Sequence, residues 1–84
     1  MSELGRNIVR IRGERGMTLR GLGAEIDLSA QYLCDIEQDR RYPPFRTIEK
    51  IANALGVGVL DLDPEVMVSV PYRLAAEHGI VVKG

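Results

Sequence analysis

Hydrophobic side chains in residues 3–62 recur mostly at intervals of three or four positions, the spacing that places them on one face of a helix. Leu4, Ile8 and Ile11 share such a face and predict a first helix near residues 3–15. Gly16 follows, and glycine is favoured after a helix because it adopts left-handed backbone angles at little cost. The pattern therefore begins with one amphipathic helix.

Two shorter helices are predicted from their N-terminal capping residues. Thr18 and Ser29 carry hydroxyl groups that can accept hydrogen bonds from the N–H groups of a first helical turn. The two caps lie eleven residues apart, so the helix after Thr18 has room for about two turns. The hydrophobic positions that follow the caps are Leu19, Leu22, Ile26, Leu33 and Ile36. This spacing predicts a helix, a tight turn near Asp27 and a further helix.

The segment Tyr42-Pro43-Pro44 breaks the pattern, because proline lacks the backbone N–H that a helix needs. Beyond it, the sequence predicts a helix near residues 45–55 that ends at Gly56, and one more helical turn within residues 57–62. No part of residues 1–60 alternates with a period of two over a useful length. The predicted fold is therefore all-α, a compact bundle of four or five short helices.

Residues 63–84 give conflicting signals. The segment Asp63-Pro64-Glu65 resembles a helix start, whereas the alternating Val66, Val68 and Val70 are typical of a strand. We therefore divide the chain into a helical domain of residues 1–62 and a C-terminal extension of residues 63–84, which forms either a short strand or a helix.

Composition limits the class of protein. The 84 residues carry a net charge of −1, and 45% of them are hydrophobic, as in ordinary globular domains. Residues 1–50 hold nine basic and eight acidic side chains, whereas residues 51–84 hold two and four. Eight of the nine basic residues in residues 1–50 are arginines, whose planar guanidinium group can donate two hydrogen bonds to a phosphate. The single cysteine, Cys34, excludes a disulfide within the chain and a multi-cysteine zinc site.

The order and spacing of these features resemble the lambda-repressor-like helix-turn-helix family, which includes the Cro and XRE-type regulators. The resemblance covers residues 4–62 without gaps and is carried by residues 11–18, 22–23, 28–29, 32–37, 40–43 and 47–57. It implies a helix-turn-helix over about residues 18–38. The second helix of that unit, the recognition helix, is implied to enter the major groove of double-stranded DNA.

The resemblance also implies roles for individual residues. Base contacts are expected from Ala30, Gln31, Cys34 and Asp35 of the recognition helix. Gln31 offers the donor and acceptor that adenine requires, whereas Asp35 either accepts from cytosine or pairs with a nearby arginine, Arg40 or Arg41. Contacts to the DNA backbone are expected from Thr18, Arg20, Ser29, Tyr32, Arg40, Arg41 and Arg46. Arg12 and Glu37 match a structural ion pair between the first and third helices.

Four positions depart from the family's usual pattern. Leu19 stands where a glutamine often contacts phosphate, so that contact is either lost or passes to Arg20. Asp27 and Asp39 occupy turn positions usually held by glycine, and aspartate is among the residues that tolerate left-handed backbone. Gly23 replaces the usual alanine where the two helices cross closely.

These observations favour a sequence-specific transcriptional regulator, a repressor that binds a palindromic operator as a homodimer. It is expected in the cytoplasm of a prokaryote, encoded by the prokaryote or by a phage. An alternative is the antitoxin of a toxin–antitoxin pair, with the C-terminal extension binding the toxin. A further alternative is an adaptor that keeps the fold without binding DNA. An enzyme is not supported, because the sequence lacks a Gly-rich phosphate loop and a nucleophile–base set.

No cofactor or metal is expected, and no apolar run is long enough to span a membrane.

The C-terminal extension is predicted to supply most of the homodimer interface. Its apolar residues are Val66, Met67, Val68, Val70, Leu74, Ile80, Val81 and Val82. Each large apolar side chain gains about 1.5–3 kcal/mol on burial, so these residues are expected to pack on their own chain or on a second copy. A two-fold dimer would match DNA half-sites about one helical turn apart.

Overall fold

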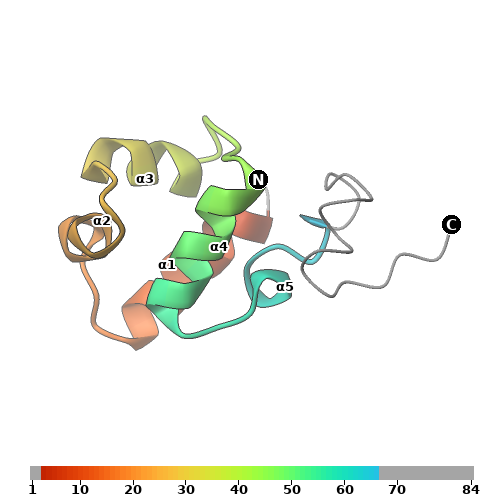
Figure 1. The fold of residues 1–84 in the computed structure, drawn as a ribbon, viewed down its shortest axis with the longest axis horizontal. Helices are drawn as coiled ribbons and strands as arrows, with labels where there is room; N and C mark the ends of the chain where they lie inside the picture. Colours follow the sequence, from red (N-terminus) through yellow and green to blue (C-terminus); the bar gives the residue numbers. More distant parts are fainter. Residues whose placement is uncertain (1–2, 67–84) are drawn as a thin grey trace, which may run out of the picture.

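The computed structural model describes residues 3–66, which form five helices in the order expected (Figure 1). The helices are α1 (Glu3–Glu14), α2 (Leu19–Ile26), α3 (Ala30–Glu37), α4 (Phe45–Leu55) and α5 (Val59–Leu62). There is no strand within residues 3–66, so the predicted all-α fold is confirmed. The predicted strand or helix of the C-terminal extension lies outside the described residues, apart from its first four positions.

The helices begin and end at the residues that the sequence indicated. Thr18 Oγ1 accepts a hydrogen bond from the Gly21 N–H at 2.9 Å, and Ser29 Oγ accepts one from the Tyr32 N–H at 3.0 Å. These side chains cap α2 and α3, because each satisfies an N–H group that has no partner within its helix. At the other end of α2, Asp27 adopts left-handed backbone with φ of 60°. Helix boundaries are thus set locally.

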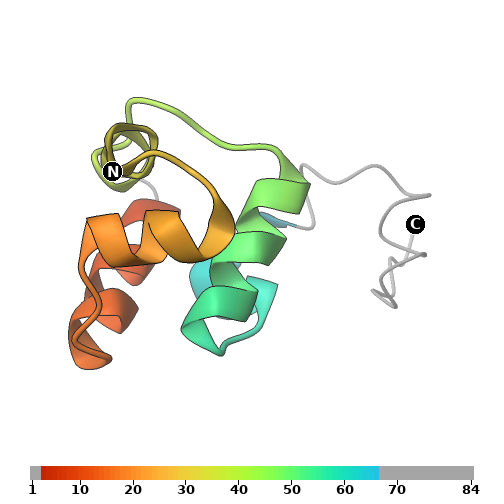
Figure 2. The same cartoon turned by 60° about the vertical axis from the view of Figure 1, so that its left-hand side comes forward.

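The hydrophobic core is shared by all five helices. Helix α3 packs against α1 and α2, whereas α4 packs against α2 and α5, and α5 also contacts α1. Figure 2 shows α2 lying across the molecule between α3 and α4. The buried apolar side chains are Leu4, Ile8, Ile11, Leu22, Leu33, Ile36, Ile48, Ile51, Ala52, Leu55, Leu62 and Val66. Because each short helix contributes to one core, tertiary packing rather than intrinsic helix propensity supports them.

Two glycines lie where backbones approach closely. A Cβ atom added to Gly23 would stand 2.3 Å from the carbonyl oxygen of Leu28, so the backbone does approach this position closely, but through the turn that leads into α3 and not through a second helix. A Cβ atom on Gly5 would stand 2.5 Å from the carbonyl oxygen of Glu37. The second contact was not predicted. It brings α1 directly against the C-terminal end of α3.

Packing continues past Leu62, the residue after which we predicted the helical domain to end. Asn7 Nδ2 donates a hydrogen bond to the Leu62 carbonyl oxygen at 2.9 Å, and the Tyr42 hydroxyl donates one to the buried Asp63 carboxylate. Val66, which we assigned to the extension, is 1% exposed and packs into the core of its own chain. Residues 63–66 therefore complete the helical body. None of the helices in this part of the chain has the length and apolar content to cross a bilayer.

Candidate nucleic-acid interface

Helix α3, the loop that follows it and the first turn of α4 together form one edge of the molecule. The three segments lie along the upper side in both Figure 1 and Figure 2. Eight of the eleven predicted DNA-contacting residues lie on this edge, and Ser29 lies at its start. The other two, Thr18 and Arg20, lie at the start of α2.

The outward face of α3 consists of polar side chains. Leu33, Ile36 and Glu37 point into the protein and are buried. With about 100° of turn per residue, the side chains opposite them are Gln31, Asp35 and Gln38, and Cys34 lies at the flank of this face. Gln38 was not among the predicted site residues, although it stands seven residues, about two turns, after Gln31. The outward face therefore presents two amides, a thiol and a carboxylate.

These outward side chains contact one another. Gln31 Nε2 donates a hydrogen bond to Asp35 Oδ1 at 3.1 Å, and Arg40 Nη1 lies 3.4 Å from the same oxygen. Gln38 Nε2 lies 3.4 Å from Cys34 Sγ. We expected Asp35 either to accept from a cytosine or to pair with Arg40 or Arg41, and in the structure it pairs with Arg40. Ala30 is half-buried at the start of the same helix.

Tyr32 connects this face to the following loop. Its ring packs partly against the core, and the Arg41 guanidinium carbon lies 5.2 Å from the ring centre. Such stacking of a cation on an aromatic ring is worth about 0.5–1 kcal/mol at an exposed site. Tyr32 therefore positions Arg41 beside α3, and Arg41 itself remains exposed.

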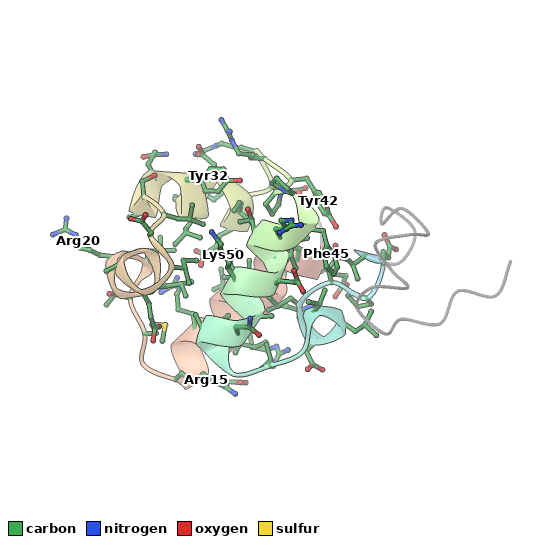
Figure 3. All side chains as sticks on the ribbon, in the orientation of Figure 1. Arg15, Arg20, Tyr32, Tyr42, Phe45 and Lys50 are labelled. Carbon is green, nitrogen blue, oxygen red and sulfur yellow. The ribbon has the colours of Figure 1, made fainter. Side chains whose placement is uncertain are left out.

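Arg20 and Arg46 occupy the second positions of α2 and α4, where acidic residues are usually favoured. The partial positive charge at a helix N-terminus makes a cation there unfavourable by about 0.3–1 kcal/mol. Neither first turn contains an acidic residue, and the first turn of α3 contains none either. Arg46 is exposed, and Figure 3 shows Arg20 extending away from the body of the molecule. These three helix starts are thus electrostatically suited to anions such as phosphate.

The capping hydroxyl groups of Thr18 and Ser29 lie on the surface. Each accepts a backbone hydrogen bond through its oxygen, as described above, and a hydroxyl group also carries one proton that it can donate. Their predicted contacts with the DNA backbone are therefore compatible with their capping role.

An ion pair holds α3 in place from behind. Arg12 Nε lies 2.8 Å from Glu37 Oε2, Arg12 Nη2 lies 3.2 Å from Glu37 Oε1, and Arg12 Nη1 donates to the Met17 carbonyl oxygen at 3.0 Å. The two side chains are 20% and 7% exposed. The paired, parallel geometry is the stronger form of an arginine–carboxylate contact. The predicted partners thus meet between α1 and α3.

Within residues 3–66, no group of three histidine, cysteine, aspartate or glutamate side chains is arranged to hold a metal ion. Every buried side-chain nitrogen or oxygen in this range has a hydrogen-bond partner.

Residues 8–62 match the family model described as helix-turn-helix. The chain is 45% identical over 56 residues to the immunity repressor protein of Bacillus phage phi105, an alignment that covers 67% of this chain and 39% of that protein. It is 39% identical over 59 residues to the HTH-type transcriptional regulator y4dJ of Sinorhizobium fredii, covering 70% of this chain and 77% of that one. The chain thus spans well under half the length of the phage relative.

A solved structure with the same fold is that of the SinR protein/SinI protein complex. The match has a TM-score of 0.69 and 26% sequence identity, and it covers 95% of this chain and 84% of that one. The sequence and the backbone therefore point to the same group of proteins.

Proposed function

The chain belongs to the helix-turn-helix family of XRE-type transcriptional regulators, and we propose that it binds a specific operator through the outward face of α3. The observation that carries this proposal is the α3 edge itself. Polar side chains at helical spacing face outward there, and arginines flank them where helix starts already favour anions. An α-helix fits the major groove, where every base pair shows a distinct set of donors and acceptors.

Base recognition in this proposal depends chiefly on Gln31. Its exposed amide supplies both a donor and an acceptor. The amide N–H can donate to adenine N7, and the amide oxygen can accept from the adenine N6 amino group. Ala30 and Cys34 are small side chains that can contact a thymine methyl group from the same face. Contacts to phosphates then come from Thr18, Arg20, Ser29, Tyr32, Arg40, Arg41 and Arg46, which fix the orientation of the protein without specifying sequence.

Two substitutions separate these roles. Gln31→Ala is expected to weaken binding to a selected duplex by about 1–3 kcal/mol at one base pair and to leave binding to unrelated duplexes unchanged. Arg46→Ala is expected to weaken binding to all duplexes and to reduce the slope of log affinity against log salt by about one unit. Fluorescence anisotropy over a salt series measures both effects.

Each variant is the control for the other in this experiment. If Gln31→Ala kept the parent's preference at every base pair, Gln31 would not be a base contact. If Arg46→Ala lost affinity for one sequence alone, its assignment to the DNA backbone would be wrong.

We propose further that the regulator represses transcription as a homodimer on a palindromic operator. It would act in the cytoplasm of a prokaryote, encoded either by the prokaryotic genome or by a phage. The phage relative is named a repressor, which supports the direction of regulation. A single short recognition helix contacts few base pairs, and a two-fold dimer doubles that number over two half-sites. The division into a DNA-binding domain and a dimerisation segment is part of this proposal, with the segment starting after Val66 because Val66 packs in the core.

Truncation after Val66 tests the homodimer. The shortened chain keeps the described helical body, so it is expected to remain helical, to sediment as a monomer and to bind the selected duplex more weakly than the full chain. Analytical ultracentrifugation of both chains gives the comparison. A truncated chain that stays dimeric, or a full chain that is monomeric at high concentration, would contradict a dimer interface in residues 67–84.

A second candidate function is a protein-binding module, such as the antitoxin of a toxin–antitoxin pair. The observation that favours it is the similarity to a chain of the SinR protein/SinI protein complex, a structure that contains two different proteins. In this alternative, residues 67–84 would bind the partner. Copurification of the full chain with the product of an adjacent gene, lost on truncation after Val66, would favour it over the homodimer.

A further inference from the structure

Asp35 lies on the predicted base-contacting face, yet both partners of its carboxylate are side chains of the same molecule. Its Oδ1 accepts from Gln31 Nε2 at 3.1 Å and from Arg40 Nη1 at 3.4 Å. We propose that Asp35 contacts no base, and that it is instead a positioning residue that fixes the amide of Gln31 in the orientation that selects adenine. This inference rests on the proposed function of α3.

The chemistry of the pair dictates which way the Gln31 amide faces. An ionised carboxylate only accepts hydrogen bonds, so the amide must turn its NH₂ group, and not its oxygen, toward Asp35. The two residues are four positions apart on α3, which places their side chains side by side on one face. One N–H of Gln31 is occupied by Asp35, while Oε1 and the second N–H remain for a ligand.

That remaining pair matches adenine and opposes guanine. Adenine presents an N7 acceptor and an N6 amino donor in the major groove, so it accepts the N–H and donates to Oε1. Guanine presents two acceptors, N7 and O6, and its O6 would face the Gln31 oxygen. Without Asp35, both N–H bonds of the amide would be free, and the NH₂ group could donate to guanine N7 and O6 together. Asp35 therefore contributes to discrimination through Gln31.

Arg40 completes the arrangement because the backbone turns back after α3. Asp39 has a φ of 65°, and the Arg40 N–H donates to the Asp35 carbonyl oxygen at 2.8 Å. This left-handed reversal returns the Arg40 side chain to the helix, where its charge offsets that of the Asp35 carboxylate. A bare carboxylate on a DNA-facing surface would repel phosphates, whereas this one is paired with a cation.

Asp35→Ala separates positioning from direct contact. The base pair to examine is the one at which Gln31→Ala abolishes the preference of the parent. There, Asp35→Ala is expected to reduce the preference for adenine over guanine by about tenfold, because the freed NH₂ group can then donate to both guanine acceptors. Affinity for unrelated duplexes is expected to rise, because the substitution removes a negative charge from the surface that faces the phosphates and Arg40 no longer shares its charge with Asp35. A variant that merely destabilised the fold would lower every affinity.

Asp39→Asn is the matched control, because it removes one negative charge beside the same helix end and asparagine also tolerates left-handed backbone. It is expected to keep the adenine preference. If Asp35→Ala keeps that preference as well, the positioning role is overturned while the proposed function stands. If Gln31→Ala abolishes no preference in the first place, Gln31 is not a base contact, and the positioning role of Asp35 is overturned with it.

A second measurement needs no DNA. In ¹H–¹⁵N spectra of the full chain, the two protons of the Gln31 side-chain amide are expected to differ more in chemical shift than those of an exposed glutamine, because one is bonded to a carboxylate. This chemical-shift difference is expected to disappear in Asp35→Ala. In Asp35→Asn it should shrink only in part, since asparagine retains one acceptor oxygen. Identical Gln31 amide signals in the parent and in Asp35→Ala would contradict the proposed orientation.

Discussion

Glu37→Ala is expected to lower the free energy of unfolding by about 3 kcal/mol, because it leaves the Arg12 guanidinium poorly exposed and without its carboxylate partner. Arg12→Ala should have a similar effect, since it removes the hydrogen bond to the Met17 carbonyl oxygen together with the ion pair. The double variant is expected to lose less than the two single losses added together. Chemical denaturation of the four proteins measures the coupling.

An exposed ion pair on the same first helix provides the control. Arg10 and Glu14 lie 3.3 Å apart, and their side chains are 56% and 54% exposed. Solvent screens such a pair, so Glu14→Ala is expected to cost no more than about 0.5 kcal/mol. Strict additivity in the cycle of Arg12 and Glu37, or equal losses for Glu14→Ala and Glu37→Ala, would refute the structural role of the buried pair.

Alanine is expected to destabilise the protein at two helical glycines and to stabilise it at a third. Gly23→Ala and Gly5→Ala would each place a methyl group within 2.5 Å of a backbone carbonyl oxygen, which no side-chain rotation can relieve. Each should lower the free energy of unfolding by about 2–3 kcal/mol, at the upper end of overpacking costs. Gly13 has nothing within 4 Å of its Cβ position, so Gly13→Ala should raise stability by about 0.5–1 kcal/mol.

Thermal unfolding of the three variants, followed by circular dichroism, distinguishes close packing from helix propensity. If propensity dominated, all three substitutions would raise the melting temperature, and the backbone contacts at Gly5 and Gly23 would carry no weight. The result at Gly23 has an additional meaning, because alanine is usual there in the family. A loss of stability would show that the turn between α2 and α3 closes more tightly in this chain.

The elements that the sequence predicted correctly are those determined by neighbouring residues. Thr18 and Ser29 cap helices because each contacts an N–H three residues away, and Asp27 and Asp39 accept left-handed backbone by virtue of their own side chains. Such interactions can be recognised from spacing alone. For the same reason, the ends of the five helices fall within one or two residues of the predicted positions.

The features that the sequence did not predict join distant parts of the chain. Gly5 meets the backbone of Glu37, and Tyr42 meets Asp63, so nothing in the local sequence of either partner signals the contact. The ion pair of Arg12 and Glu37 is also distant, and the resemblance to the family supplied it. Asp35 shows a different limit: its spacing from Gln31 placed both on one face, but only the folded structure shows which partners its carboxylate has.

The measurement that tests the central claim most directly is selection of duplexes from a randomised DNA library by the full-length chain, followed by sequencing of the bound fraction. Binding of a specific operator through α3 predicts a short run of strongly preferred base pairs, repeated as an inverted half-site about one helical turn away. Bound duplexes with no preference at any position, or a chain that retains no DNA at low salt, would contradict it.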